Sequence, residues 1–137
     1  MKPAVEDVRR VAIGLPRAEE ALVRGRVKFR VGRIVFVALS RDETLLGFAF
    51  PRAERAALVA SEPHKFQLPG ESDLRFNWVV ARLDALDLEE MTELVLSAWE
   101  MCVPKSVAAA HLATLQLFPE PLILPGASVE NTQNEDT

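Results

Sequence analysis

A row of basic side chains near the N-terminus has the clearest chemistry in this sequence. Arginine or lysine occupies every second position from Arg24 through Arg26 and Lys28 to Arg30, and Arg33 follows shortly after. Alternate residues of a β-strand point to the same face, so one strand would present these four cations together. Such a row can follow the phosphates of a nucleic acid, and arginine can bind a phosphate through two hydrogen bonds. The spacing therefore indicates a nucleic-acid-binding surface, with Arg33 at its end.

A simpler interpretation of the same row stays open. Strands often carry a solvated basic face, and charged side chains on an edge strand prevent aggregation. Pairing with the next apolar segment would also place the basic residues opposite apolar ones, whose side chains the long basic stems could cover. The expected pairs are Arg30 with Val35, Lys28 with Val37 and Arg26 with Leu39.

The other chemically capable residues form no recognisable catalytic or metal-binding pattern. His64, His111 and Cys102 are too few and too scattered for a structural zinc site, which uses about four ligands in closely spaced pairs. Cys102 falls on the apolar side of an expected helix, which is typical of a buried, unreactive thiol. Ser97 and Ser106 belong to no known nucleophile motif. We therefore expect no enzyme, no cofactor and no bound metal.

The apolar pattern predicts the elements around the basic row. Helical spacing predicts a first helix over residues 3–14, and alternation predicts a strand over 25–31. Gly32-Arg33 suits a two-residue type II′ turn into an apolar, central strand over 34–39. Later segments predict strands over 44–50, 65–68 and 74–83, and helices over 54–59, 88–102 and 106–115. The order α-β-β-β-α-β-β-α-α predicts an α+β fold with one antiparallel sheet of about five strands.

Two tryptophans bear on the binding hypothesis. An exposed Trp78 beside the basic row could stack on a base. The alternation of Leu74, Phe76, Trp78 and Val80 favours instead a face of the sheet that is buried in the core. Trp99 lies at the edge of the apolar stripe of its helix, and we expect it to pack in the core.

Length and composition predict one globular domain. The chain has 137 residues, of which 49% are hydrophobic and 26% charged. We expect this domain to cover residues 1–118, and the proline-rich, then acidic tail of residues 119–137 to lack regular structure. No apolar run reaches the roughly 18 residues of a membrane helix, and the first residues do not resemble a signal peptide. A single cysteine fits a reducing compartment, so we expect a cytoplasmic protein.

The charge is distributed unevenly along the chain. Residues 1–41 hold ten basic and four acidic side chains, whereas residues 42–118 hold six basic and twelve acidic ones. Residues 119–137 add four acidic side chains and no basic one, and the net charge is −4. This balance argues against nucleic-acid binding over the whole surface but is compatible with a local basic patch. The opposed segments are also compatible with a protein partner.

The order and spacing of several short motifs resemble the MmcQ/YjbR family. The matching segments are Gly14-Leu15-Pro16, Phe29-Arg30-Val31-Gly32-Arg33-Ile34-Val35-Phe36, Pro51 to Leu58 with Glu54-Arg55, Phe76-Asn77-Trp78-Val79, and Glu93-Leu94 to Ser97-Ala98-Trp99. The resemblance covers about residues 5–112. It implies a fold of sheet and helices similar to that of secretion chaperones, and DNA binding of the "double wing" kind.

One segment departs from the family pattern. Many relatives have a lysine in the third strand, shortly before the proline that opens the next helix, whereas this chain has Gly47-Phe48-Ala49-Phe50. A role of that lysine is therefore not transferred to this chain. The main hypothesis is a DNA-binding module that uses the basic hairpin. The alternative is a protein-interaction or chaperone-like module that does not bind nucleic acid.

Overall fold

The computed structural model describes residues 2–117, which divide into two units. The first unit ends at Pro104 and the second begins at Lys105. The elements of the first unit are α1 (Val5–Ile13), β1 (Ala18–Val23), β2 (Arg26–Val31), β3 (Ile34–Leu39), β4 (Leu45–Ala49), α2 (Arg55–Ser61), β5 (Phe66–Gln67), β6 (Trp78–Arg82) and α3 (Leu88–Glu100). The second unit contains α4 (Lys105–Leu117). The expected tail of residues 119–137 lies outside the described residues, and the single domain over residues 1–118 stays a prediction.

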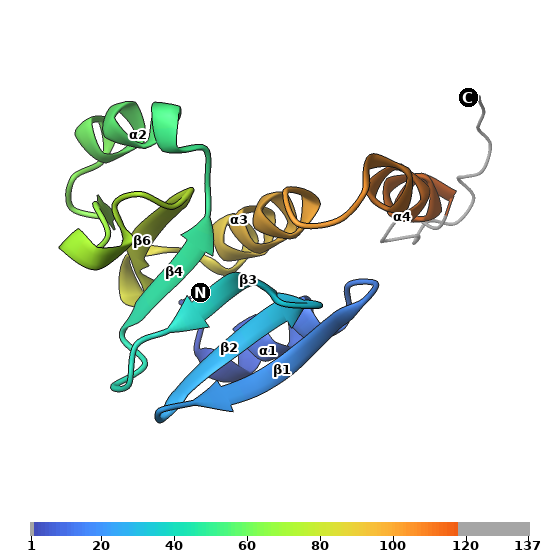
Figure 1. Ribbon diagram of the computed structural model, residues 1–137, viewed down its shortest axis with the longest axis horizontal. Coiled ribbons are helices and arrows are strands. Elements are labelled where there is room, and N and C mark those ends of the chain that lie inside the picture. Colours follow the sequence, from blue (N-terminus) through green and yellow to red (C-terminus); the bar gives the residue numbers. More distant parts are fainter. Residues whose placement is uncertain (1, 118–137) are drawn as a thin grey trace. The chain divides into compact units, whose positions relative to one another are not determined.

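Six strands form one antiparallel sheet in the order β1-β2-β3-β4-β6-β5 (Figure 1). The predicted α+β class with a single antiparallel sheet is confirmed, and the sheet has one strand more than expected. The missed strand is β1, whose sequence Ala-Glu-Glu-Ala-Leu-Val does not alternate between apolar and polar residues. Glu20 interrupts the alternation because its carboxylate binds the guanidinium of Arg9 on α1, with an Nε–Oε1 distance of 2.9 Å.

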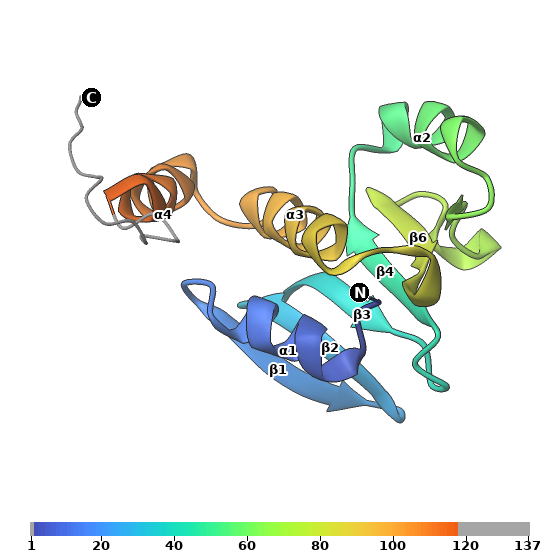
Figure 2. The same cartoon turned by 180° about the vertical axis from the view of Figure 1, so that it is seen from behind.

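One face of the sheet is covered by α1 and α3 (Figure 2). Phe29, Val37, Phe48 and Val79 pair in a single row across β2, β3, β4 and β6, and each is at most 1% exposed. Val8 of α1 and the α3 residues Met91, Val95 and Trp99 are also fully buried. The Trp99 indole N–H donates to the carbonyl oxygen of Pro16 at 2.9 Å. The prediction that Trp99 packs in the core is confirmed.

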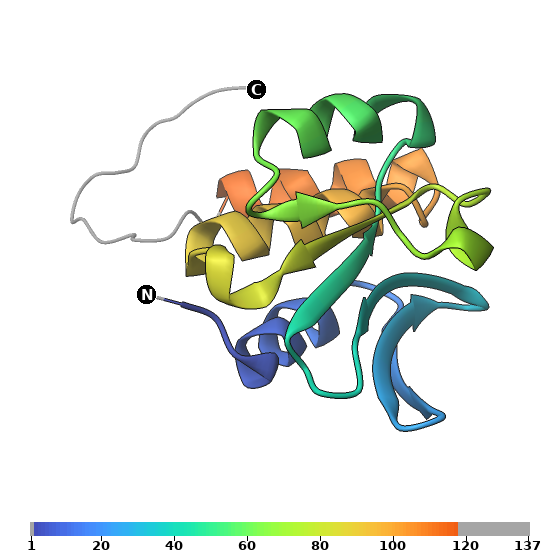
Figure 3. The ribbon, with the colours of Figure 1, turned by 90° about the vertical axis from the view of Figure 1, so that its left-hand side faces the viewer.

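The opposite face, which we call the outer face, is turned toward the viewer in Figure 1. Lys28, Ala38, Gly47 and Val80 pair in a row across this face, one residue out of step with the buried row. Figure 3 shows α2 alongside β5, at the edge of the sheet away from β1. Neither α1 nor α3 lies over the outer face of β1 to β4.

The last long strand is shorter than predicted, and its faces are reversed. Val79 and Ala81 face the core, whereas Trp78 and Val80 are half-buried on the outer face. Leu74 and Phe76 lie before the strand and are exposed. The prediction of one buried face from Leu74 to Val80 is wrong, because both faces of β6 carry apolar side chains. Alternation alone does not say which of two apolar faces the helices cover.

A buried arginine keeps the segment before β6 out of the sheet. The Arg55 side chain, only 9% exposed, donates from Nη1 to the carbonyl oxygens of Phe76 at 3.0 Å and Trp78 at 3.2 Å. Its Nη2 donates to the carbonyl oxygen of Leu74. The backbone N–H of Arg52 also donates to Asn77 Oδ1, at 2.9 Å. The guanidinium thus takes carbonyls that a neighbouring strand would otherwise bind.

The start of α3 is capped by a side chain. Asp87 is the N-cap residue, and its Oδ1 accepts a hydrogen bond from the backbone N–H of Glu90 at 2.8 Å. The Glu90 carboxylate binds Lys65 instead of returning to the cap. Within residues 2–117, no helix has both the length and the apolar character that a membrane span requires.

Candidate nucleic-acid interface

The basic row lies on β2, and the structure places this strand inside the sheet. Arg26, Lys28 and Arg30 alternate with Val27, Phe29 and Val31, and Phe29 is fully buried on the core face. The three basic side chains therefore share the outer face. Since β1 forms the edge next to β2, protection of an exposed strand edge does not explain the basic row.

The pairing of β2 with β3 differs in part from the expected register. Arg30 lies opposite Val35, as predicted, but Lys28 lies opposite Ala38, because a bulge shifts the register between Phe29 and Arg30. The pair of Arg26 with Leu39 is not formed, since the paired stretch of β3 ends at Ala38 on the β2 side. Lys28 thus stands beside a methyl group, and its stem covers less apolar surface than the expected register implies.

The partners of the basic residues distinguish them from one another. Arg30 forms an ion pair with Glu19 of β1, with an Nη2–Oε1 distance of 3.1 Å. Among residues 2–117, neither Arg26 nor Lys28 forms an ion pair with a carboxylate. The cations at Arg9, Arg10 and Lys65, on other parts of the fold, all have carboxylate partners. Arg26 and Lys28 therefore carry charges that no carboxylate of residues 2–117 neutralises, as do other cations of the fold such as Arg17, Arg33 and Arg82.

Arg24 and Arg33 lie in turns at opposite ends of β2. Arg24 and Gly25 connect β1 to β2 with φ of +54° and +79°, the signs that a type I′ turn requires. Arg24 is therefore outside the strand, and its predicted place in a four-residue strand row is wrong. Gly32 has φ of +61° and precedes Arg33 in the two-residue connection to β3, as predicted.

Sequence reasoning missed a further cation at the same end as Arg24. The Nε of Arg41 donates to the carbonyl oxygen of Arg24 at 3.0 Å. Four strands in a meander bring their first and third turns to one end of the sheet, as Figure 1 shows for β1–β2 and β3–β4. Arg24, Arg26, Lys28 and Arg41, here named the basic surface, form no ion pair with a carboxylate of residues 2–117.

Trp78 also lies on the outer face. It pairs with Ala49 of β4, and its indole occupies the space above Gly47, the next outer-face residue of that strand. A Cβ at position 47 would lie 2.7 Å from the indole Nε1 and 2.8 Å from Cζ2. Gly47 thus allows the indole to lie close to the sheet, within the segment where the family pattern has a lysine.

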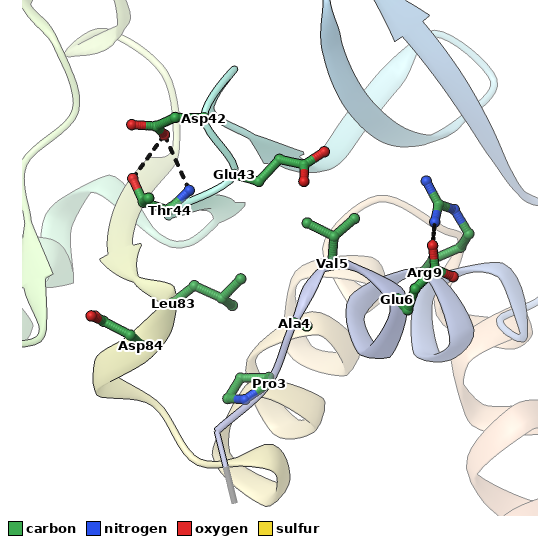
Figure 4. Close-up of a pocket in the computed structure, with 10 residues that line it drawn as sticks. All are labelled: Pro3, Ala4, Val5, Glu6, Arg9, Asp42, Glu43, Thr44, Leu83 and Asp84. Carbon is green, nitrogen blue, oxygen red and sulfur yellow. Dashed lines mark hydrogen bonds and ion pairs between the residues drawn. The ribbon is translucent and has the colours of Figure 1, made fainter.

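A surface pocket of about 540 Å³ lies elsewhere, beside the N-terminal segment (Figure 4). It is lined by residues before and within α1, by the β3–β4 turn, and by Leu83 and Asp84 after β6. Two of its polar residues, Asp42 and Arg9, are already bound to other side chains of the protein. Asp42 Oδ1 accepts hydrogen bonds from Ser40 Oγ at 2.7 Å and from Thr44 Oγ1 at 2.8 Å, and these bonds lower the pKa of Asp42. Arg9 is held by Glu20 and Glu6, which raise its pKa.

The residues considered for metal binding or reactivity are not among those that line this pocket. Within residues 2–117, no three His, Cys, Asp or Glu side chains are grouped so that they could hold a metal ion. Cys102 is half-buried just after α3, and burial raises the pKa of its thiol. A raised pKa leaves less of the reactive thiolate near neutral pH. The basic surface is therefore the arrangement in these residues with the clearest chemical use, which is the binding of anions.

Comparison with known proteins gives a family and a fold. The YjbR family model matches residues 13–101. The crystal structure of the Deinococcus radiodurans protein DR2400, which carries the domain DUF419, is similar with a TM-score of 0.66. The two chains are 22% identical, and the similarity covers 95% of this chain and 97% of that one, which supports the fold alone. A search of curated proteins finds no match.

Proposed function

This chain belongs to the YjbR family, and we propose that it is a binding protein without catalytic activity that contacts DNA through the outer face of β2. The observation that carries the proposal is the basic surface itself. Arg26 and Lys28 project from an interior strand, and the turns at one end add Arg24 and Arg41. Phosphates would supply the counter-charges that residues 2–117 do not provide there.

The basic surface is a local cluster of cations in a chain whose net charge is −4. Of the sixteen basic side chains, only Arg9, Arg10, Arg30 and Lys65 pair with a carboxylate of residues 2–117. Clustered cations that lack such partners repel one another, which disfavours the folded state unless an anion binds. An anionic partner with regularly spaced charges fits a row on a strand better than a single small anion does.

The direct test is fluorescence anisotropy of a labelled DNA duplex over a series of salt concentrations. We expect binding at about 50 mM salt that weakens as salt rises, with a log–log slope of about −2.7 for three neutralised phosphates. The variant Arg26→Gln/Lys28→Gln should reduce the magnitude of that slope by about two, because each lost phosphate contact removes about one. The loss of affinity should be about the same for every duplex sequence, because phosphate contacts do not depend on the bases.

The matched control removes the same charge from another part of the fold. Lys2 donates to the carbonyl oxygen of Asp84, and Arg10 pairs with Asp7 on α1. The variant Lys2→Gln/Arg10→Gln should therefore keep most of the salt slope. Equal losses in the two variants would mean that only net charge matters and would contradict the proposed surface. If no duplex or single strand binds at about 50 mM salt, DNA binding itself is refuted, and a protein partner becomes the next hypothesis to test.

A second variant should strengthen binding. Glu19→Gln removes the carboxylate that pairs with Arg30 and makes this guanidinium available to a phosphate. We expect affinity for the duplex to rise by about 1.4- to fivefold, since an exposed ion pair is worth about 0.2–1 kcal/mol. The same anisotropy titration measures it. Glu20→Gln makes an identical charge change one residue along, where the partner is Arg9 of α1, and equal gains in both variants would exclude a specific role for Arg30.

A further inference from the structure

Trp78 and Lys28 lie on the outer face of the sheet, opposite the face that α1 and α3 cover. Lys28, Ala38 and Gly47 are paired neighbours on β2, β3 and β4, and the indole of Trp78 lies above Gly47. Adjacent strands are about 4.8 Å apart, so the Lys28 backbone and the indole are separated by about 10 Å. Lys28 and Trp78 are both half-buried, with part of each side chain in contact with solvent.

Only small residues lie on the outer face between Lys28 and Trp78 in this row. Ala38 contributes one methyl group and Gly47 no side chain, so no bulky residue of this row separates the ammonium group of Lys28 from the indole. An extended strand of nucleic acid lying across β2, β3 and β4 could place phosphates on Arg26 and Lys28 and a neighbouring base against Trp78. Proteins that bind single strands combine these two features, a cationic track and an aromatic side chain on which a base stacks.

We propose that the preferred ligand of the outer face is a single-stranded nucleic acid, with one base stacked on Trp78. This inference rests on the proposed function and specifies its substrate class. A duplex can satisfy the basic surface through its phosphates, but its bases are stacked on one another and do not present a free face. A single strand satisfies the cations and the indole together. The expected preference for single strands therefore comes from Trp78 and not from charge.

The test uses the full chain, a labelled thymidine oligonucleotide and a duplex of equal length, at the same salt concentration. Trp78→Leu keeps apolar bulk above Gly47 but removes the aromatic ring, whereas Trp78→Phe retains a ring. We expect Trp78→Leu to weaken single-strand binding by roughly tenfold, and Trp78→Phe to recover much of it, because base stacking is worth about 1–3 kcal/mol. Both variants should bind the duplex within about twofold of the original protein. Thermal unfolding of each variant shows that it is folded.

Intrinsic fluorescence gives an independent readout. The only other tryptophan, Trp99, is fully buried, so quenching by an added oligonucleotide reports on Trp78. Quenching by the single strand, absent in Trp78→Phe and weak with the duplex, is the expected result. Duplex binding without a single-strand preference, and without an effect of Trp78→Leu, would overturn this inference and leave the proposed function intact. Absence of binding to both forms would overturn both.

Discussion

Replacing Arg55 by alanine should lower the free energy of unfolding by about 2–4 kcal/mol. Its guanidinium binds three backbone carbonyls, those of Leu74, Phe76 and Trp78, and the side chain is only 9% exposed. Hydrogen bonds with a charged partner contribute about 1.5–3 kcal/mol each, and water can partly replace them because the 74–77 segment is exposed. Urea unfolding, followed by circular dichroism, measures the loss.

Two further variants separate the carbonyl contacts from the loss of a positive charge. Arg55→Lys keeps the charge but cannot reach three carbonyls in the same geometry, so it should recover only part of the stability. Arg52→Ala removes an exposed arginine that donates to the carbonyl oxygen of Arg75, and it should change the free energy of unfolding by less than about 1 kcal/mol. An effect of Arg55→Ala as small as that of Arg52→Ala would show that the segment before β6 does not depend on Arg55.

The same contacts explain why one part of the sheet could not be predicted from the sequence. Residues 74–83 alternate as a strand should, but the carbonyls of the first part bind Arg55, which lies about twenty residues earlier in the chain. A hydrogen bond between residues so far apart in the chain does not change the periodicity of apolar residues in the sequence. The predicted strand therefore included residues before β6 whose backbone carbonyls accept hydrogen bonds from the Arg55 side chain. Only the pairing of β6 with β4 shows where the strand begins, at Trp78.

Elements with a strong apolar pattern were predicted closely. The hairpin of β2 and β3, with its Gly32-Arg33 turn, and the helix α3 are present as expected. These features depend on neighbouring residues and on one covered face. In β1 the consecutive glutamates face opposite sides, and each binds an arginine, Glu19 that of β2 and Glu20 that of α1. β1 is thus joined to its neighbours partly by ion pairs, and it lacks the alternation of apolar and polar residues from which a strand is predicted.

The candidate site was predictable as a row but not as a surface. The alternation of basic and apolar residues predicted that Arg26, Lys28 and Arg30 share one face of a strand, and the structure agrees. It could not show that Glu19 neutralises Arg30, that Arg41 joins Arg24, or that Trp78 shares the face, since each depends on a strand partner. For β6 in particular, both faces are apolar, so the side that the helices cover decides whether Trp78 is core or surface.

The close approach of Trp78 to Gly47 predicts a reversal of sign in a double-mutant cycle. In the original protein, Gly47→Ala should destabilise the fold by about 1–3 kcal/mol, because the new Cβ lies 2.7–2.9 Å from three indole atoms. In a Trp78→Ala background the obstacle is gone. The same substitution should then stabilise by up to about 1 kcal/mol, since glycine is unfavourable within a strand by roughly 0.5–1 kcal/mol relative to alanine. Urea unfolding of the four proteins should therefore give a coupling energy of about 2 kcal/mol or more.

Gly70→Ala is the matched control for this cycle. A Cβ at Gly70 meets no atom within 4 Å, and the φ of −59° there suits alanine. It should change stability by less than about 0.5 kcal/mol in either background. Additivity of Gly47→Ala and Trp78→Ala to within about 0.5 kcal/mol would mean that the two residues do not interact. Coupling of the expected size would instead fix the indole on the outer face, because a tryptophan turned into the core could not respond to a methyl group on Gly47.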